Sequence, residues 1–494
     1  MILMMEIFYK IPEHGMKGAN VATNVYHALG SYKRFPSLVS YSGTSTTGKD
    51  AHGSGSFRDN SNAVFNFVAT KTDIYQLSSG AFTSRKGSLT GDDDDYWTFT
   101  QFGEYVIASN GVDAAQYYLM GTSTNFADLT SIQTAGTCPL FRVSGVVRDF
   151  LVTGNIVNAT NRIQWSGIND IATWESGTKQ ADQQDLPGSG GEIVHITSGE
   201  IGYVFRQNQI IRMDYVGGAT IFRLSVISPN RGAVYGRTVC QDNRRVFFYA
   251  DDGFFEINGD NVIAIGAEKI NRFFDVDLNK AFSDRICAAV DPFNQLALWL
   301  YPSASNTSNT TGICDKILIY NYATQKWSTA DASASTIFSQ FVGAYTVELM
   351  DIISENLDQI NIALDTDFWS GGQRYLGAID NNYKAAIFSG TENEGTIETR
   401  ELELFPGHRS SITNVRPIVD ATATVIIKSK EKLSDTETVS TSSSMVTSGD
   451  NPVRQSGRYF RIQVTTPSGT AWTHAQGVDL KASRIGLRWR TKLI

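Results

Sequence analysis

The chain has 494 residues and a formal net charge of -8, with 41% hydrophobic and 19% charged residues. This length allows two to four domains, or fewer if a propeller or barrel fills one of them, and the apolar content suffices for a large core. The acidic balance argues against a general nucleic-acid binder, which carries a basic surface. Few charges, many turn-forming residues and 11% aromatic residues favour a β-rich chain.

The start of the chain, "MILMMEIFYKIPEHG", is apolar for only a few residues before Glu6 and Lys10. We therefore expect no signal peptide, and no window approaches the roughly 18 apolar residues of a membrane helix. The cysteines lie far apart without a C-x-x-C pair, which predicts buried free thiols in a reducing compartment rather than a disulfide framework or a zinc site. They are Cys138, Cys240, Cys287 and Cys314.

Short β-forming runs separated by turn residues fill the first three quarters of the chain. In "VFFYADDGFFEINGDNVIAIGAEKINRFF" (246–274), a first strand ends at Ala250, and a second begins after the Asp-Asp-Gly sequence that ends at Gly253. Glycine adopts positive φ at little cost, which favours a hairpin turn there. We predict that Asp251 and Asp252 are turn residues rather than a carboxylate site.

The same hairpin pattern recurs along the chain, at residues 63–82, 102–121, 146–167, 192–217, 286–302, 315–331 and 373–390. Through residue 287 the units begin about 40 to 48 residues apart, which is the period of a four-stranded propeller blade. We therefore predict an all-β fold, with a β-propeller of six or seven blades over residues 36–390. No blade carries a WD or kelch signature.

Two segments carry helical signals: residues 268–286 predict a helix, and residues 344–364 are ambiguous between helix and strand. From residue 391 onward, apolar and polar residues alternate at period two, which predicts strands. A Ser/Thr-rich stretch at 433–452 predicts a mobile loop. The expected division is a 1–35 N-terminal extension, a 36–390 propeller and a 391–494 small C-terminal β domain.

No motif predicts catalysis, a cofactor or a metal site. "GTSTTGKD" (43–50) matches the first part of a phosphate-binding loop, but Asp50 replaces the required Ser or Thr, and the following residues cannot start a helix. It is predicted to be a flexible turn. The six histidines show no metal-ligand spacing. They are His14, His27, His52, His195, His408 and His474.

Four consecutive acids, Asp92, Asp93, Asp94 and Asp95, form the most concentrated charge in the sequence. They lack the spacing of an EF-hand calcium loop, which favours a solvated loop. A cation site and an acidic surface facing another molecule are the alternatives.

Several tryptophans sit near predicted strand ends, where they would pack between blades or, alternatively, stack on sugar rings. They are Trp165, Trp174, Trp299, Trp327, Trp369, Trp472 and Trp489.

Four segments together carry a resemblance to a known family. They are "NRIQWSGINDIATWESG" (161–177), "LPGSGGEIVHITSGEIGYVFRQNQIIRMDYVGG" (186–218), "RLSVISPNRGAVYGRTVCQDNRRVFFYADDGFFEINGD" (223–260) and "AWTHAQGVDLKASRIGLRWR" (471–490). In this order they resemble the tail hub, or nozzle, proteins of short-tailed bacteriophages, also called DNA-stabilisation or tail accessory factors. The resemblance covers about residue 140 to the C-terminus.

The resemblance implies a non-enzymatic structural protein of the virion tail, made in the host bacterial cytoplasm. It implies a β-propeller with β extensions, assembled as a homohexameric ring below the portal and adaptor proteins. The partners would be the adaptor, tail fibre, spike or needle proteins, and double-stranded DNA that passes without specific binding. It implies no cofactor and no membrane insertion.

An acidic lumen would repel DNA phosphates, and Asp92, Asp93, Asp94 and Asp95 are one expected acidic channel or interface surface. The main alternative function is a carbohydrate-binding or carbohydrate-cleaving β-propeller. A tail fibre or spike component is a third possibility, and it would be a trimer.

Overall fold

The structure, a computed structural model, describes residues 7–10, 20–28, 30–218, 220–342 and 374–485. The chain divides into two compact units. The propeller unit comprises residues 38–317 and 332–388, and the sandwich unit comprises residues 1–37, 318–331 and 389–494. In the described ranges, no helix is long and apolar enough to cross a membrane.

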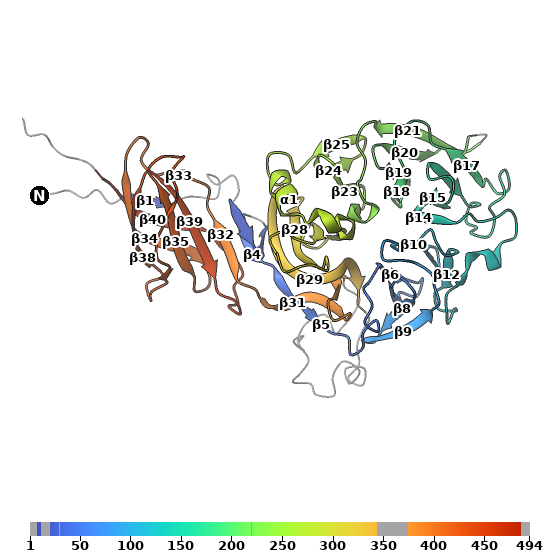
Figure 1. Ribbon diagram of the computed structural model, residues 1–494, viewed down its shortest axis with the longest axis horizontal. Helices are drawn as coiled ribbons and strands as arrows, with labels where there is room; N and C mark the ends of the chain where they lie inside the picture. The colour runs from blue at the N-terminus through green and yellow to red at the C-terminus, as the bar shows by residue number, and fades with distance from the viewer. Residues whose placement is uncertain (1–6, 11–19, 29, 219, 343–373, 486–494) are drawn as a thin grey trace, which may run out of the picture. The chain divides into compact units, whose positions relative to one another are not determined.

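Five antiparallel four-stranded sheets, each made of consecutive strands, form the first five blades of a β-propeller (Figure 1). Blade 1 comprises β6 (Gly53–Arg58), β7 (Val64–Ala69), β8 (Ile74–Ser78) and β9 (Ala81–Lys86). Blade 2 comprises β10 (Thr98–Phe102), β11 (Tyr105–Ser109), β12 (Gln116–Leu119) and β13 (Ala127–Asp128). Blade 3 comprises β14 (Phe141–Val147), β15 (Phe150–Ile156), β16 (Arg162–Trp165) and β17 (Asp182–Asp185).

Blade 4 comprises β18 (Ile193–Ile196), β19 (Ile201–Arg206), β20 (Ile210–Tyr215) and β21 (Phe222–Ser228), and blade 5 comprises β22 (Cys240–Asp242), β23 (Arg245–Ala250), β24 (Gly253–Asn258) and β25 (Asn261–Ala264). The first strands of the five blades therefore begin at residues 53, 98, 141, 193 and 240, at intervals of 43 to 52 residues. Three of the four intervals fall within the predicted 40 to 48 residues, and the interval from residue 141 to residue 193 is longer, at 52.

The last two blades share one long strand. Blade 6 contains β26 (Cys287–Asp291), β27 (Leu296–Tyr301), β28 (Cys314–Asn321) and the start of β29 (Lys326–Phe341). Blade 7 contains the second half of β29, then β30 (Arg374–Asp380), β31 (Ala385–Glu392) and β5 (Pro36–Ser40). The described strands thus form seven blades.

The N-terminal strand β5 closes the ring, because it pairs with β31, which follows it by more than 300 residues. Just after β5, the backbone amide of Tyr41 donates to the carbonyl oxygen of Ala385 at 2.9 Å, and the amide of Ala385 donates to Oγ of Ser42 at 2.9 Å. On the other side of blade 7, the amide of Phe341 donates to Oγ of Ser56 in blade 1 at 2.8 Å. Blade 7 is thereby tied to both ends of the propeller sequence.

Hydrophobic clusters fill the spaces between consecutive blades. Phe67 of blade 1 is fully buried, and its ring lies edge-on to Tyr118 of blade 2, with centroids 5.1 Å apart. The tryptophans follow the same rule: Trp165, Trp174 and Trp299 are at most 3% exposed. The core interpretation is confirmed for these three, and their rings are not available as sugar-stacking platforms.

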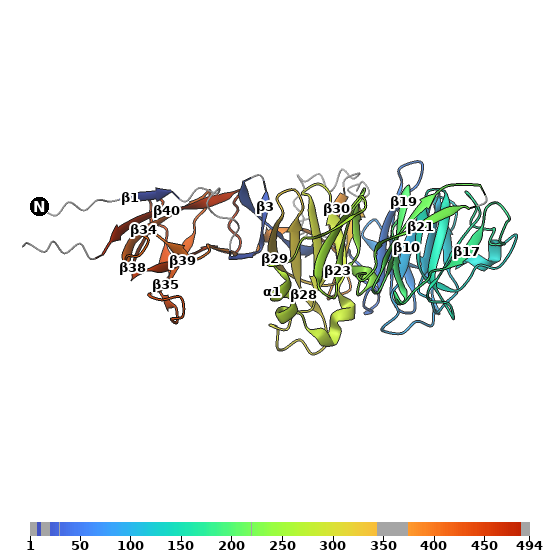
Figure 2. The same ribbon diagram turned by 90° about the horizontal axis from the view of Figure 1, so that it is seen from above.

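The helix predicted at 268–286 is present as two short pieces, α1 (Asn271–Asp277) and the 3-10 helix η3 (Lys280–Arg285). Figure 2 views the propeller edge-on, with α1 on one of its faces. Phe274 of α1 anchors the segment, since its ring lies 4.9 Å from those of Phe254 and Tyr301. Two other 3-10 turns are η1 (Leu129–Ile132) and η2 (Gly236–Thr238). The ambiguous segment 344–364 lies outside the described residues.

The Asp-Asp-Gly sequence is the turn between β23 and β24, as predicted. Asp252 is held by the guanidinium of Arg231, with Nη2 2.5 Å from Oδ2. Gly253 has φ +127°, and a Cβ there would lie 1.8 Å from Nδ2 of Asn271. That amide donates to the carbonyl oxygen of Asp252 at 3.0 Å, so the turn is braced by α1.

The sandwich unit consists of two sheets around a shared core. The first sheet has the order β3-β4-β40-β34-β38, with β1 also paired to β40; the second, joined to β29, runs β2-β32-β39-β35-β36, with β33 on β39 and β37 on β35. The N-terminal strands are β1 (Ile7–Lys10), β2 (Val21–Thr23), β3 (Val25–Ala28) and β4 (Ser31–Arg34). The others are β32 (Gly395–Glu398), β33 (Leu402–Glu403), β34 (Ser410–Val419), β35 (Thr424–Lys430), β36 (Thr438–Val439), β37 (Ser443–Ser444), β38 (Asn451–Gly457), β39 (Tyr459–Thr466) and β40 (Ala475–Arg484).

Two expectations for this unit need correction. Residues 1–35 are not a separate extension, because their strands pair with the C-terminal sheets and belong to the same unit as residues 389–494 and 318–331. The stretch 433–452, expected as a mobile loop, contains β36 and β37, both hydrogen-bonded to β35. The partners of β1 and β2 lie near the other end of the chain, so local composition did not reveal them, whereas β36 and β37 pair with the nearby β35.

A buried carboxylate lies in the second sheet of the sandwich unit. The side chain of Glu398 is 2% exposed and accepts hydrogen bonds from Lys428, from Arg461 at 3.0 Å and from Asn20 at 2.9 Å. Burial alone would raise the pKa of Glu398, but these hydrogen bonds and the charge of Lys428 outweigh it, and the pKa lies below its usual value.

Candidate functional site

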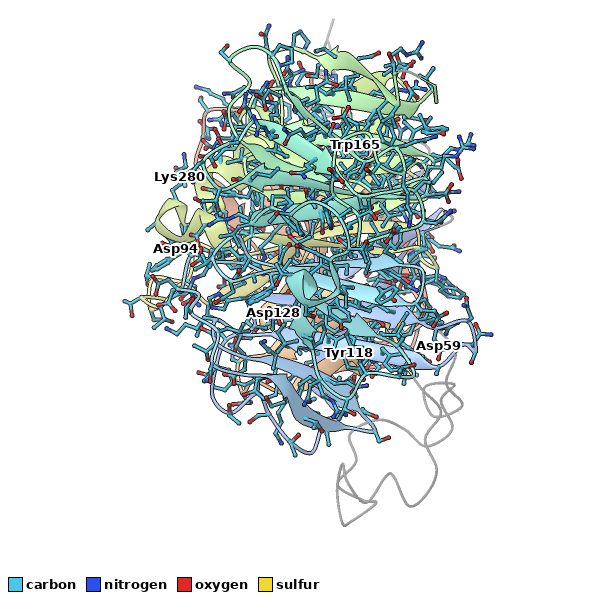
Figure 3. The ribbon with its side chains drawn as sticks, turned by 90° about the vertical axis from the view of Figure 1, so that its right-hand side faces the viewer. Asp59, Asp94, Tyr118, Asp128, Trp165 and Lys280 are labelled. Atoms are coloured by element: carbon cyan, nitrogen blue, oxygen red, sulfur yellow. The ribbon has the colours of Figure 1, made fainter. Side chains whose placement is uncertain are left out.

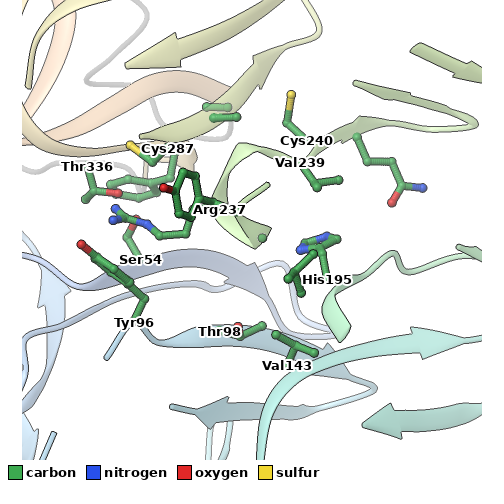
Figure 4. A pocket seen from close by; sticks show the side chains of 18 of the residues that line it. Ser54, Tyr96, Thr98, Val143, His195, Arg237, Val239, Cys240, Cys287 and Thr336 are labelled. Carbon is green, nitrogen blue, oxygen red and sulfur yellow. The ribbon is translucent and has the colours of Figure 1, made fainter. Parts of the chain in front are cut away.

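A cavity with a volume of about 650 Å³ lies in the central channel of the propeller (Figure 4). One strand of each blade lines it, namely β6, β10, β14, β18, β22, β26 and the second half of β29, together with Asn155 of β15 and Arg374 of β30. The seven strands named first are the innermost strands of the seven blades. The volume is typical of a small-molecule pocket, which ranges over about 300–1,000 Å³.

The inner strands converge near the axis, where space favours small side chains. Gly53 and Gly55 of β6, Val143 of β14 and Ala288 of β26 all line the channel. A Cβ on Gly53 would lie 2.5 Å from the carbonyl oxygen of Trp97, so glycine is required for the close approach of blades 1 and 2. Larger side chains, among them Arg142, His195 and Phe338, also line the channel.

One end of the channel carries an ordered group of polar side chains. The ring of Tyr96 stacks on His52 with centroids 5.4 Å apart, and its hydroxyl donates to Oδ2 of Asp284 at 2.8 Å. The guanidinium carbon of Arg237 lies 4.2 Å from the centroid of the Tyr96 ring, in a cation–π contact. Burial raises the pKa of Tyr96, Asp284 adds to this shift, and the positive charge of Arg237 opposes it. The phenol therefore stays protonated at neutral pH.

His195 of β18 lines the channel. Burial lowers the pKa of His195 to about 4, so its imidazole is neutral at pH 7. Its ring lies edge-on to Phe205, with centroids 6.2 Å apart.

Two arginines contact one aromatic ring where β6 and β29 end and β30 begins. The guanidinium carbons of Arg58 and Arg374 lie 3.9 Å and 4.4 Å from the centroid of the Phe341 ring. Burial, and next the neighbouring charge of Arg58, lowers the pKa of Arg374. Because an arginine remains charged even so, this cluster places two positive charges beside the blade 7–blade 1 junction.

The four consecutive acids lie in the loop between β9 and β10. Asp93 pairs with Lys71 at 2.9 Å, and Asp95 pairs with Arg142 at 2.9 Å. The hydrogen bond from Lys71 and its charge lower the pKa of Asp93. Half of the expected acidic surface is therefore already neutralised by the chain's own cations.

The remaining two acids, Asp92 and Asp94, are exposed. Asp94 lines the mouth of the channel. Figure 3 shows that it points to the same face of the propeller as Lys280, whereas Asp59 lies toward the opposite face. The acidic run is thus a feature of one propeller face.

The sequence "GTSTTGKD" forms a turn that ties blades together. The amide of Thr46 donates to the carbonyl oxygen of Tyr383 in blade 7 at 3.0 Å, and Nζ of Lys49 contacts Asp73 in blade 1 at 2.5 Å. No helix follows it, since β6 begins at Gly53. The motif therefore has a structural role, and the lysine of the pattern is already occupied by a carboxylate.

The other sequence-predicted features are scattered. The four cysteines are free and buried, as their spacing predicted. Within the described ranges, no three His, Cys, Asp or Glu side chains gather in a way that could hold a metal ion. His14 and the tryptophans at 369 and 489 lie outside the described residues.

Sequence reasoning missed the group around Tyr96 and Arg237. Its members come from loops near residues 52, 96, 237 and 284, which meet only because the propeller brings one end of each blade to the same face. The one local signal was that each of these residues lies one to three positions before the first strand of a blade.

Comparison with protein-family models and with curated protein sequences finds no match. Solved structures with a similar course of the chain include one from the mitotic checkpoint complex, with 10% identity, a TM-score of 0.40, and coverage of 74% of this chain and 98% of that one. The WD40 domain of Pan2 from Neurospora crassa has 7% identity, a TM-score of 0.37, and coverage of 73% and 96%.

The extracellular domain of a hybrid two-component system from B. thetaiotaomicron has 10% identity and a TM-score of 0.42, and the match covers 77% of this chain but only 43% of that one. None of these likenesses bears on function. The propeller assignment rests on the five four-stranded sheets and on the last two blades, which share β29.

Proposed function

We propose that this protein is a structural, non-enzymatic component of a short-tailed phage virion, a tail nozzle that assembles as a ring of six copies. The observation that carries the proposal is the combination of a propeller with a second β unit built from both ends of the chain, taken together with the ordered segments that resemble this family. A propeller with β extensions is the architecture that the resemblance implies.

The size of the propeller's own channel bears on how such a nozzle would conduct DNA. A cavity of about 650 Å³ has the volume of a small-molecule pocket and cannot pass a duplex. The DNA path would therefore be the space enclosed by the ring of copies. A net charge of -8 on each copy disfavours tight binding of phosphates, which suits a passage that DNA must leave again.

The connectivity of the chain suits a part that bears load. The chain passes between the propeller unit and the sandwich unit four times, after residues 37, 317, 331 and 388. A mechanical force on one unit is therefore distributed over the four chain segments that connect the two units. We propose that the exposed strands and loops of these units contact the adaptor ring and the fibre, spike or needle proteins.

Native mass spectrometry and electron microscopy of the purified full chain, alone and with the adaptor ring, test the proposal. Six copies of the 54.3 kDa chain give a ring of about 326 kDa. A trimer of about 163 kDa would instead support a fibre or spike component. Virions whose tail axis carries no ring of this chain would refute the nozzle.

A carbohydrate function is tested in parallel. The nozzle predicts no signal on a glycan array and no depolymerisation of host polysaccharide. The burial of Trp165, Trp174 and Trp299 weighs against sugar stacking at these rings. Saturable binding of a glycan would overturn this part of the proposal.

A further inference from the structure

A second, smaller cavity lies on the propeller face that carries Tyr96, beside the mouth of the central channel. It has a volume of about 110 Å³ and is named here the arginine cavity. Its polar lining comes from blades 1, 2, 5, 6 and 7 and their loops: Asp50, His52, Asp93, Tyr96, Arg237, Arg285, Ser335 and Asn381. This volume is enough for a few water molecules or for one tetrahedral oxyanion.

The two arginines of this cavity have no carboxylate partner. Within the described residues, neither Arg237 nor Arg285 forms an ion pair or a side-chain hydrogen bond, and Nη2 of Arg237 is buried without any partner. Most other arginines in the propeller unit do have such partners, as Arg231 has in Asp252. A buried guanidinium N–H without an acceptor costs stability, so an acceptor from outside the chain would be favoured there.

Arg237 is held in place before any ligand arrives. Its guanidinium lies on the ring of Tyr96, and that ring is fixed on one side by His52 and at its hydroxyl by Asp284. A guanidinium oriented in this way loses little side-chain entropy on binding, and its planar fork suits the oxygens of an oxyanion.

The charges around the cavity leave room for an anion. Of the two carboxylates in the lining, Asp93 is paired with Lys71 at 2.9 Å, and Asp50 is exposed to solvent. Burial lowers the pKa of His52, with Arg237 adding to the effect, so this imidazole is neutral at pH 7. The lining therefore holds two guanidiniums and two carboxylates, and a third carboxylate, Asp284, accepts a hydrogen bond from the hydroxyl of Tyr96. The two guanidiniums are the cations of the lining that form no ion pair within the described residues.

We propose that the arginine cavity binds a small tetrahedral oxyanion of the phosphate class, with Arg237 and Arg285 as its ligands. The anion is either free phosphate or the phosphate group of a phosphomonoester. This inference is independent of the nozzle proposal, because it concerns one propeller face and needs no assembly.

The test is isothermal titration of inorganic phosphate into the full chain at pH 7.5, in chloride buffer of constant ionic strength. We expect one saturable site per chain. Arg285→Gln should weaken binding at least tenfold, since a hydrogen bond to a charged group contributes about 1.5–3 kcal/mol. Arg285 does not stack on Tyr96, so this variant leaves the neighbouring aromatic group intact.

The matched control is Arg148→Gln. Arg148 also lies over an aromatic ring, Tyr215 at 4.4 Å, but it is half-exposed and remote from the cavity lining. This variant removes one positive charge and should bind phosphate like the wild type. Arg237→Gln, checked for an unchanged circular dichroism spectrum, should also abolish saturation.

Further titrations separate the sources of the anion. Equal affinity for a nucleoside monophosphate and for phosphate assigns the site to phosphomonoesters, and binding of phosphate alone assigns it to the free ion. Acetate and a duplex oligonucleotide should not compete with phosphate. The proposal is overturned by the absence of a saturable site, or by equal affinity in the Arg285→Gln variant. A ring of six copies that fails to bind phosphate would refute this site and leave the nozzle standing.

Discussion

The closure of the propeller by β5 can be tested at Tyr41, which directly follows that strand. Tyr41 is 3% exposed and belongs to a cluster that joins blade 7, through Phe338 and Ile387, to blade 1, through Val68 and Leu77. Its hydroxyl also accepts a hydrogen bond from the side chain of a glutamine in β29. The residue therefore combines a large buried ring with one buried polar contact.

Tyr41→Ala removes both contributions. Truncation of a buried aromatic residue costs about 3–5 kcal/mol, whereas Tyr41→Phe loses only the hydrogen bond and should cost about 1 kcal/mol. The control is Phe293→Ala, which truncates a ring that is 89% exposed and should change stability by less than about 0.5 kcal/mol.

Equilibrium urea unfolding measures these differences, and hydrogen exchange locates them. In Tyr41→Ala, the amides of β30 and β31 should exchange faster than in the wild type, because the open ring leaves blade 7 without its outer support. A Tyr41→Ala variant within about 1 kcal/mol of the wild type would refute the closure argument. So would unchanged exchange in β30 and β31.

Three further predictions concern a charge, a turn and the thiols. Glu398→Gln should lower the urea midpoint of the sandwich unit at pH 7 and flatten the pH dependence of its stability. The pKa of Glu398 is depressed in the folded state. The stabilisation by the carboxylate is therefore present above the unfolded pKa of about 4.3 and is lost as the pH falls through the folded pKa. Gly253→Ala should destabilise the propeller by more than about 2 kcal/mol, whereas Gly259→Ala, where a Cβ meets nothing within 4 Å, should cost about 1–2 kcal/mol, both measured by urea unfolding. The four buried cysteines should resist a thiol reagent in the native protein and all react in guanidinium, and rapid labelling of the native chain would contradict their burial.

Local sequence patterns predicted much of the fold, because each blade is a meander of strands close together in the chain. The hairpin at Gly253 and the interval between blades depend on turn residues and on alternation, and both are visible in a single sequence. The burial of Trp165 and Trp299 follows from the same pattern.

The parts that could not be predicted depend on contacts between distant segments. The pairing of β5 with β31 joins residues more than 300 positions apart. The strand β29 is long because it takes part in two neighbouring blades, and no local signal marks its change of partner. The arginine cavity likewise combines side chains from five blades, so Arg237 and Arg285 are unremarkable in the sequence and become a pair only in the folded ring.

The placement of both chain ends has a consequence for folding. Strand β5 cannot pair with β31, β2 with β32, or β1 and β4 with β40 until those late strands have been made, although β4 can pair earlier with β3. During synthesis, blades 1 to 5 contain all their own strands and can form in order, whereas blade 7 and the sandwich unit wait for the last hundred residues. Contacts of such high sequence separation form slowly, because the entropy of closing long loops must be overcome first. Ring closure and completion of the sandwich unit therefore come late, and the arginine cavity, whose lining includes Ser335 and Asn381 of blade 7, forms only once that blade is in place.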